Sequence, residues 1–184
     1  MLTKTEVTIE RPRDEVFRRF VDEMATTYPL ICPATTSVRM GREKPMAAGA
    51  TGQMTIRNLF MAAIVDFTVT RYEKGEHLSI KASHGSRSSR SDYLFRDAGT
   101  STTVTMVTEG PAVGPRWLQD RNQRTLEGHD RHDAQRLKAL LEGRQKNPAK
   151  AHRRSLIRLV LIAWALAALL GAAWATYRAI TMGA

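Results

Sequence analysis

A stretch of nineteen residues without a charged side chain, Leu159 to Tyr177, restricts what the rest of the chain can fold into. As a helix it would be roughly 28 Å long, close to the hydrocarbon thickness of a bilayer. A helix that is apolar on all sides needs either lipid or a large protein around it. The remaining chain is too short to bury it, which favours a transmembrane helix over 156–178, with a short tail over 179–184, instead of a core helix.

Both ends of this predicted span carry residue types that are common at membrane interfaces. Trp and Tyr combine an apolar ring with a polar group, and long Arg side chains can reach the lipid headgroups. The expected interface residues are Arg153, Arg154, Arg158, Trp164, Tyr177 and Arg178.

Small residues recur at intervals of four within the same span. They are Ala163, Ala167, Gly171 and Ala175. Such a stripe allows two membrane helices to approach closely, so a homodimer through this face is one hypothesis. The other is that the stripe reflects the abundance of alanine in this chain.

The basic residues are concentrated next to the span. The chain has 28 Lys and Arg and 18 Asp and Glu, a formal net charge of +10. Seven of the basic residues and none of the acidic ones lie from Arg144 onward. This asymmetry predicts a single-pass protein of the cell membrane with its N-terminal domain in the cytoplasm and a basic linker over 144–155. A nucleic-acid-binding domain would itself carry the charge, so we expect no nucleic acid partner.

Two further features agree with a cytoplasmic domain. The opening MLTKTEVTIE has no apolar run of the kind that a secretion signal requires. The single cysteine, Cys32, fits a reducing compartment.

Residues 1–143 are long enough for one domain with its own core. TEVTIE alternates as a strand, and 11–24 follows helical spacing after Pro12. A short helix or turn near 26–31 is followed by six strand-like segments and by a helix over 115–142. The strand-like segments are 35–41, 52–59, 62–73, 77–83, 91–97 and 100–109, and SHGSRSSRS over 83–91 is expected to be a loop whose ends join its neighbours. Short turns between strands predict a curved antiparallel sheet around the long helix, an α+β fold.

Four segments of this domain resemble the SRPBCC superfamily, which includes START-type lipid-transfer domains, polyketide cyclases and dehydrases, and birch-pollen-allergen-like proteins. They are VTIERPRDEVFRRFVD, TRYEKGEHLSIKAS, YLFRDAGTSTTVTMVTEG and RLKALLEG. The resemblance covers nearly all of residues 3–143. It implies a helix-grip fold, in which a curved seven-stranded sheet wraps a long C-terminal helix and leaves a cavity for an apolar ligand. The chain departs from many relatives at MATTYPLICPATT, where they have a Trp.

The long helix carries a stripe that is apolar at its ends and polar in its middle. Spacing of three and four residues aligns one set of side chains, which are Leu118, Asn122, Leu126, His129, Asp133, Leu137 and Leu140. Polar side chains in a closed core would need partners, so this stripe either lines a cavity or turns toward solvent. The expected cavity residues, for which strand parity stays open, are Met54, Ile56, Phe67, Ile80, Tyr93, Phe95, Met106, Asn122, Leu126, His129 and Asp133.

Signals for catalysis or metal binding are weak. The sequence has no evident nucleophile–base pair, phosphate loop or paired-carboxylate motif. His129 and Asp133 are the first candidates for acid–base chemistry. With His132 they could ligate a metal, but their spacing does not match HExxH and no Cys is near. We therefore predict no metal and no cofactor.

Two functions follow as hypotheses. The first is membrane-anchored binding, or transfer, of a lipid or other hydrophobic small molecule, with the anchor holding the cavity beside its ligand pool. The alternative is a cyclase- or dehydrase-type enzyme acting on a hydrophobic intermediate. A regulatory scaffold has no supporting feature beyond the anchor.

Overall fold

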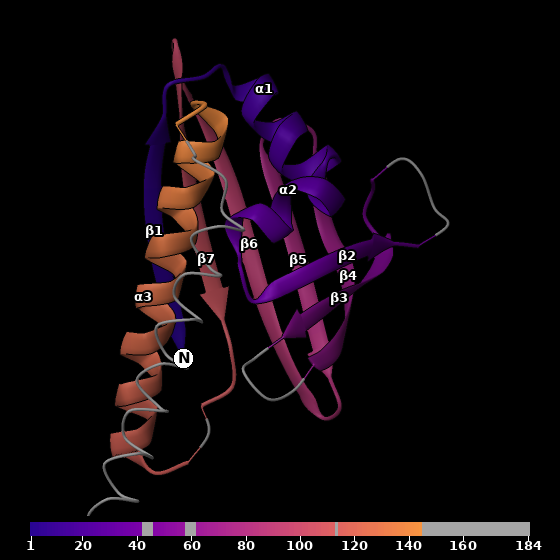
Figure 1. Ribbon diagram of the computed structural model, residues 1–184, viewed down its shortest axis with the longest axis vertical. Helices are drawn as coiled ribbons and strands as arrows, with labels where there is room; N and C mark the ends of the chain where they lie inside the picture. Colours follow the sequence, from indigo (N-terminus) through magenta and orange to yellow (C-terminus); the bar gives the residue numbers. More distant parts are fainter. Residues whose placement is uncertain (42–45, 58–61, 113, 145–184) are drawn as a thin grey trace, which may run out of the picture. The chain divides into compact units, whose positions relative to one another are not determined.

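The computed structural model describes residues 1–41, 46–57, 62–112 and 114–144 (Figure 1). Strand β1 (Leu2–Ile9) is followed by the helices α1 (Arg13–Phe17), η1 (Arg18–Asp22, a π-helical turn) and α2 (Met24–Ile31). Six strands come next, and α3 (Arg116–Leu141) ends the domain. The strands are β2 (Thr35–Met40), β3 (Thr51–Arg57), β4 (Ala62–Glu73), β5 (His77–His84), β6 (Arg87–Ala98) and β7 (Ser101–Glu109). The predicted order of elements is confirmed.

The seven strands form one antiparallel sheet in the order β1-β7-β6-β5-β4-β3-β2. β1 pairs with β7, with Val7 opposite Val104, so the first strand lies beside the last. The register shifts between Val69 and Arg71 in β4, and such bulges bend and twist a strand. Figure 1 shows α3 running along β1, with which it makes most of its contacts. The predicted helix-grip arrangement of sheet and long helix is thereby confirmed.

One end of the inner sheet face is filled by aromatic rings. Phe17 and Phe20 come from α1 and η1, as the helical spacing of the apolar residues predicts. The Phe17 ring meets Phe95 edge to face at 5.1 Å, and Phe20 meets Tyr93 at 4.9 Å. Such pairs contribute about 0.5–1.5 kcal/mol each beyond the burial of their area. The packed rings cover the inner sheet face at this end.

The two halves of α3 differ in burial. In the C-terminal half, Ala134, Leu137 and Leu141 are fully buried in the core. Among the described side chains from Arg116 to Asp133, none is fully buried, and Trp117 is 68% exposed. The C-terminal half therefore anchors the helix, while the N-terminal half leaves space beside the sheet.

The segment expected to be a loop over 83–91 is mostly strand. His84 pairs with Arg87, which leaves Gly85 and Ser86 as a two-residue turn. Gly85 has φ +58, a value that glycine adopts without strain and that tight hairpins require. Because the turn at Gly85 reverses the chain within two residues, the serine- and arginine-rich segments on either side of it pair with each other as the ends of β5 and β6.

Within residues 1–144 apart from the gaps given above, no helix is both long and apolar enough to cross a membrane. The predicted span over 156–178, its interface residues and its small-residue stripe lie outside the described residues.

Candidate functional site

A cavity of about 310 Å³ opens on the inner face of β3 to β6, beside α2. Sites for small molecules occupy roughly 300–1,000 Å³, so this volume lies at the lower end of that range. Its apolar wall consists of Met54, Ile56, Val65, Ile80 and Ala82. Because it is more enclosed than the second space described below, we call it the main cavity.

A second space of about 410 Å³ lies beside the N-terminal half of α3, and we call it the α3 hollow. Its lining includes Asn122, Leu126 and His129. Arg87 and Pro111 belong to the linings of both spaces. The main cavity and the α3 hollow therefore adjoin next to the turn between β5 and β6.

The residues expected to line a cavity are found in four different places. Those in the main cavity are Met54, Ile56, Ile80 and Tyr93, and those in the α3 hollow are Asn122, Leu126 and His129. Phe67, Phe95 and Met106 are buried core residues that belong to neither lining. They share the inner sheet face with the first group, but they are covered by packed side chains. Asp133 is half-buried and belongs to neither lining.

Two phenols lie at the inner end of the main cavity. Tyr28 comes from α2 and Tyr93 from β6, and their hydroxyl groups interact with each other. Burial raises the pKa of Tyr93 to about 12. The neighbouring Tyr93, together with burial, raises the pKa of Tyr28 well above its ordinary value. Both side chains are therefore neutral hydrogen-bonding groups at pH 7.

Cys32 and Asp133 meet behind these phenols. The Cys32 amide donates to the Tyr28 carbonyl at 2.9 Å, a helical bond that places the two side chains one turn apart. Burial raises the pKa of Asp133 to about 6, although the Cys32 thiol and the Arg136 guanidinium, 3.6 Å away, favour its ionised form. Burial and the nearby Asp133 raise the pKa of Cys32. Asp133 can thus exchange a proton near neutral pH, a property of acid–base groups.

The two candidate acid–base residues lie in different surroundings. His129 is exposed in the α3 hollow, whereas Asp133 is half-buried and contacts Cys32, which lines the main cavity. His132 is exposed as well. In the described part of the chain, no group of three or more His, Cys, Asp and Glu side chains is placed to hold a metal ion.

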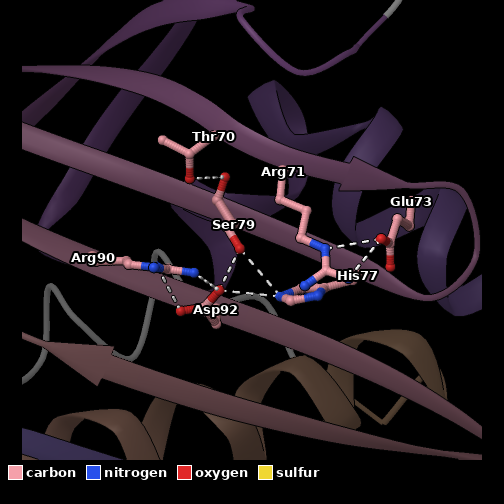
Figure 2. Close-up of polar contacts among 7 residues, drawn as sticks. All are labelled: Thr70, Arg71, Glu73, His77, Ser79, Arg90 and Asp92. Carbon is pink, nitrogen blue, oxygen red and sulfur yellow. Dashed lines mark hydrogen bonds and ion pairs between the residues drawn. The ribbon is translucent and has the colours of Figure 1, made fainter.

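A Ser–His–Asp cluster lies on the opposite face of the sheet (Figure 2). The Asp92 carboxylate accepts hydrogen bonds from Ser79 and from Arg90, and it lies 3.1 Å from His77 Nε2. Although burial raises the pKa of Asp92, hydrogen bonds from Ser79, Arg90 and His77 lower it below its ordinary value. His77 uses the same nitrogen toward both Ser79 and Asp92, whereas a nucleophile relay uses the two ring nitrogens separately. We interpret this cluster as a structural link between β5 and β6.

Several residues of the site were not singled out from the sequence. Tyr28 and Cys32 lie in the segment that departs from the superfamily, and nothing in the sequence beyond that departure and the presence of a single cysteine points to them. His84 and Arg87 belong to the serine- and arginine-rich run that was expected to be a loop. The strand register was needed to place them at the cavity.

Comparisons with known proteins agree with the fold. Residues 2–142 match the sequence model of a family described as polyketide cyclase / dehydrase and lipid transport. A search of characterised protein sequences finds no significant match.

Solved structures with a similar fold come from several sources. The Zhui aromatase/cyclase from Streptomyces sp. R1128 has a TM-score of 0.62 and 13% identity, covering 78% of this chain and 94% of that one. TTHA0849 from Thermus thermophilus has a TM-score of 0.61 and 11% identity, covering 79% and 100%. Ara h 8.0201 has a TM-score of 0.58 and 12% identity, covering 77% and 97%. At these identities the likeness establishes the fold.

Proposed function

The chain belongs to the polyketide cyclase/dehydrase and lipid-transport family, and from that premise we propose that it binds a lipid or another hydrophobic small molecule in the main cavity. The main support is the cavity itself, an apolar wall that ends at two neutral phenols. Burial of a ligand chain contributes about 0.8 kcal/mol per methylene group. Extraction of the chain from a bilayer costs a similar amount, so transfer from membrane to cavity is close to neutral in free energy.

A near-neutral transfer favours a binding domain that is held next to its source. We propose that the segment over 156–178 is a transmembrane helix, with 144–155 as the basic linker and the binding domain in the cytoplasm. The nineteen uncharged residues and the basic residues before them support this. Pairing of two such helices through Ala163, Ala167, Gly171 and Ala175 is a secondary proposal.

The anchor is tested by fractionation. The full chain should stay with the membranes after a wash in alkaline carbonate, and a chain that ends at Arg144 should be released. Release of the full chain would contradict the proposed anchor, but it would leave the proposal of ligand binding untouched.

Ligand binding is tested with a variant that fills the cavity. The full chain, purified in nanodiscs and extracted, should yield a bound hydrophobic compound by mass spectrometry, as should an Ile64→Trp control on the exposed face of β4. Ile80→Trp places an indole in the cavity wall and should abolish that signal. Ala82→Phe, at a less buried position of the same wall, should do the same if Ile80→Trp does not fold. Equal recovery from folded cavity variants and control would contradict the proposal.

One observation favours an enzyme as the second candidate. Asp133, with a pKa of about 6, contacts Cys32 beside the two phenols, so a proton could pass between this group and a bound intermediate. An Asp133→Asn variant that binds ligand but loses turnover of a cyclisable polyketide would support that function. Unchanged turnover would exclude Asp133 as the acid–base group.

A further inference from the structure

The tip of the β5–β6 hairpin presents two basic side chains to the cavity. Along β5, Ile80 and Ala82 line the main cavity, so His84 shares their face by strand alternation. Along β6, Tyr93 and Arg87 share a face in the same way. His84 and Arg87 are direct partners in the ladder, and both belong to the cavity lining. The His84 Nδ1 donates to the Ile64 carbonyl oxygen at 2.9 Å, so the Nε2 is the ring nitrogen left for a ligand.

These basic groups are not balanced by acidic ones. Among the described residues that line the main cavity and the α3 hollow, there is no Asp or Glu. Arg87 belongs to both linings and makes no ion pair or side-chain hydrogen bond with any described residue. Arg90, three residues further along β6, faces the other side of the sheet and pairs with Asp92 at 2.9 Å. The guanidinium of Arg87 is thus available to a ligand, and its planar donors match a carboxylate or phosphate.

The charged side chains of the main cavity lie at this mouth. Further inward, β6 contributes Ser89 and Ser91, whose hydroxyls can donate to an oxyanion, and the neighbouring strands contribute apolar side chains, with Ile80 directly opposite Ser91. The Asp133 carboxyl near the inner end would repel a second anion there. A ligand with a negative head therefore fits with the head at the hairpin tip and the apolar part inside.

We propose that the main cavity takes an anionic amphiphile, whose carboxylate or phosphate is bound by Arg87 at the hairpin tip beside His84 and whose apolar chain lies against Met54 and Ile80. This inference rests on the proposed function, because it takes the main cavity as the ligand site. The hydrogen bonds of Arg87 to an anion are charge-assisted, so they are stronger than those to a neutral hydroxyl.

The test uses the full chain in phosphatidylcholine nanodiscs and four eight-carbon probes in calorimetry, with empty nanodiscs subtracted. Octanoate and octyl phosphate should bind about tenfold more tightly than octanol, and octyltrimethylammonium more weakly than octanol. Arg87→Gln should remove the preference for the anions and leave octanol binding unchanged. Arg87→Lys should keep part of it, and the control Arg90→Gln, on the outer face, should keep it fully.

The outcomes separate the two proposals. If octanol bound as tightly as octanoate, the proposal of an anionic ligand would be overturned while the hydrophobic site stayed supported. The same would follow if Arg87→Gln and Arg90→Gln weakened octanoate binding equally. Inorganic phosphate binding as tightly as octyl phosphate would indicate a free-anion site and would also overturn it. Absence of binding by all four eight-carbon probes would contradict the proposed function itself.

Discussion

Gly52 on β3 lies directly opposite Phe67 on β4, and the Phe67 ring occupies the space where a side chain of residue 52 would begin. A Cβ at this position would also stand 2.6 Å from the Arg39 carbonyl oxygen, so neither the ring nor the backbone leaves room for it. Phe67 is fully buried because glycine faces it. This contact joins three neighbouring strands at the edge of the sheet that carries part of the cavity wall.

Gly52→Ala should therefore destabilise the domain by about 1–3 kcal/mol, because the added methyl group forces Phe67 or the backbone of β2 to move. Urea unfolding of the full chain, followed by circular dichroism, measures this. Gly128→Ala is the matched control, since its Cβ would meet nothing within 4 Å on α3. Alanine favours a helix more than glycine does, so this change should stabilise by up to about 1 kcal/mol. Equal effects of the two changes would contradict the close contact.

Asp133 should make stability fall as the pH rises. Its pKa is raised by burial to about 6 from an ordinary value of 3.8, so the folded state holds the proton more tightly than the unfolded chain does. Below pH 4 the carboxyl is neutral in the folded and the unfolded state and hardly changes the free energy of unfolding. Once the pH exceeds 6, ionisation in the partly buried site lowers the free energy of unfolding by about 2 kcal/mol. Asp133→Asn should become more stable relative to the wild type between pH 4 and pH 7, as measured by urea unfolding. A constant difference would show that the carboxyl is not desolvated.

Cys32, the only cysteine in the chain, is a direct probe of the main cavity. Burial, with the nearby Asp133 carboxyl, raises the pKa of its thiol, so iodoacetamide at pH 8 should label it more slowly than in urea-unfolded protein. Octanoate in the cavity should slow the labelling of folded protein further, as followed by mass spectrometry. Ile80→Trp should make the labelling rate independent of octanoate. A rate that octanoate leaves unchanged in the wild type would place the ligand elsewhere.

The Asp92 cluster should contribute to stability and not to binding. Asp92→Ala removes the carboxylate that Ser79, His77 and Arg90 share and leaves only the 3.1 Å contact between Ser79 and His77, which should destabilise by about 1–3 kcal/mol. Because hydrogen bonds lower the pKa of Asp92, its contribution is present above pH 4 and is lost as the pH falls further. Urea unfolding at pH 7 and pH 3, with octanoate calorimetry beside it, measures both properties. Loss of octanoate binding in folded Asp92→Ala would contradict a purely structural role, because it would show that the cluster on the outer sheet face affects binding in the main cavity.

Strand and helix identity was predictable because it depends on neighbours in the chain. Alternation in 62–73 and 100–109 corresponds to β4 and β7, and helical spacing over 115–142 corresponds to α3 within one residue at each end. Turns at Gly75 and Gly99, both with positive φ, follow from residue type alone. The residue types at the hairpin tip favour a loop, because serine and arginine have no strong strand pattern of their own, and only the pairing of β5 with β6 makes this segment a strand.

The face and the depth of each side chain were decided only by the tertiary structure. Ile80 and Phe95 both point inward from neighbouring strands, but Phe95 is covered by Phe17 and Phe20 while Ile80 borders open space. No local pattern distinguishes them, because packing against α1 and η1 involves residues far apart in the chain. In the same way, Cys32 meets Asp133 only because the fold brings the end of α2 against α3. The sequence determined which segments form strands and helices, and long-range packing decided where they leave a cavity and which polar groups surround it.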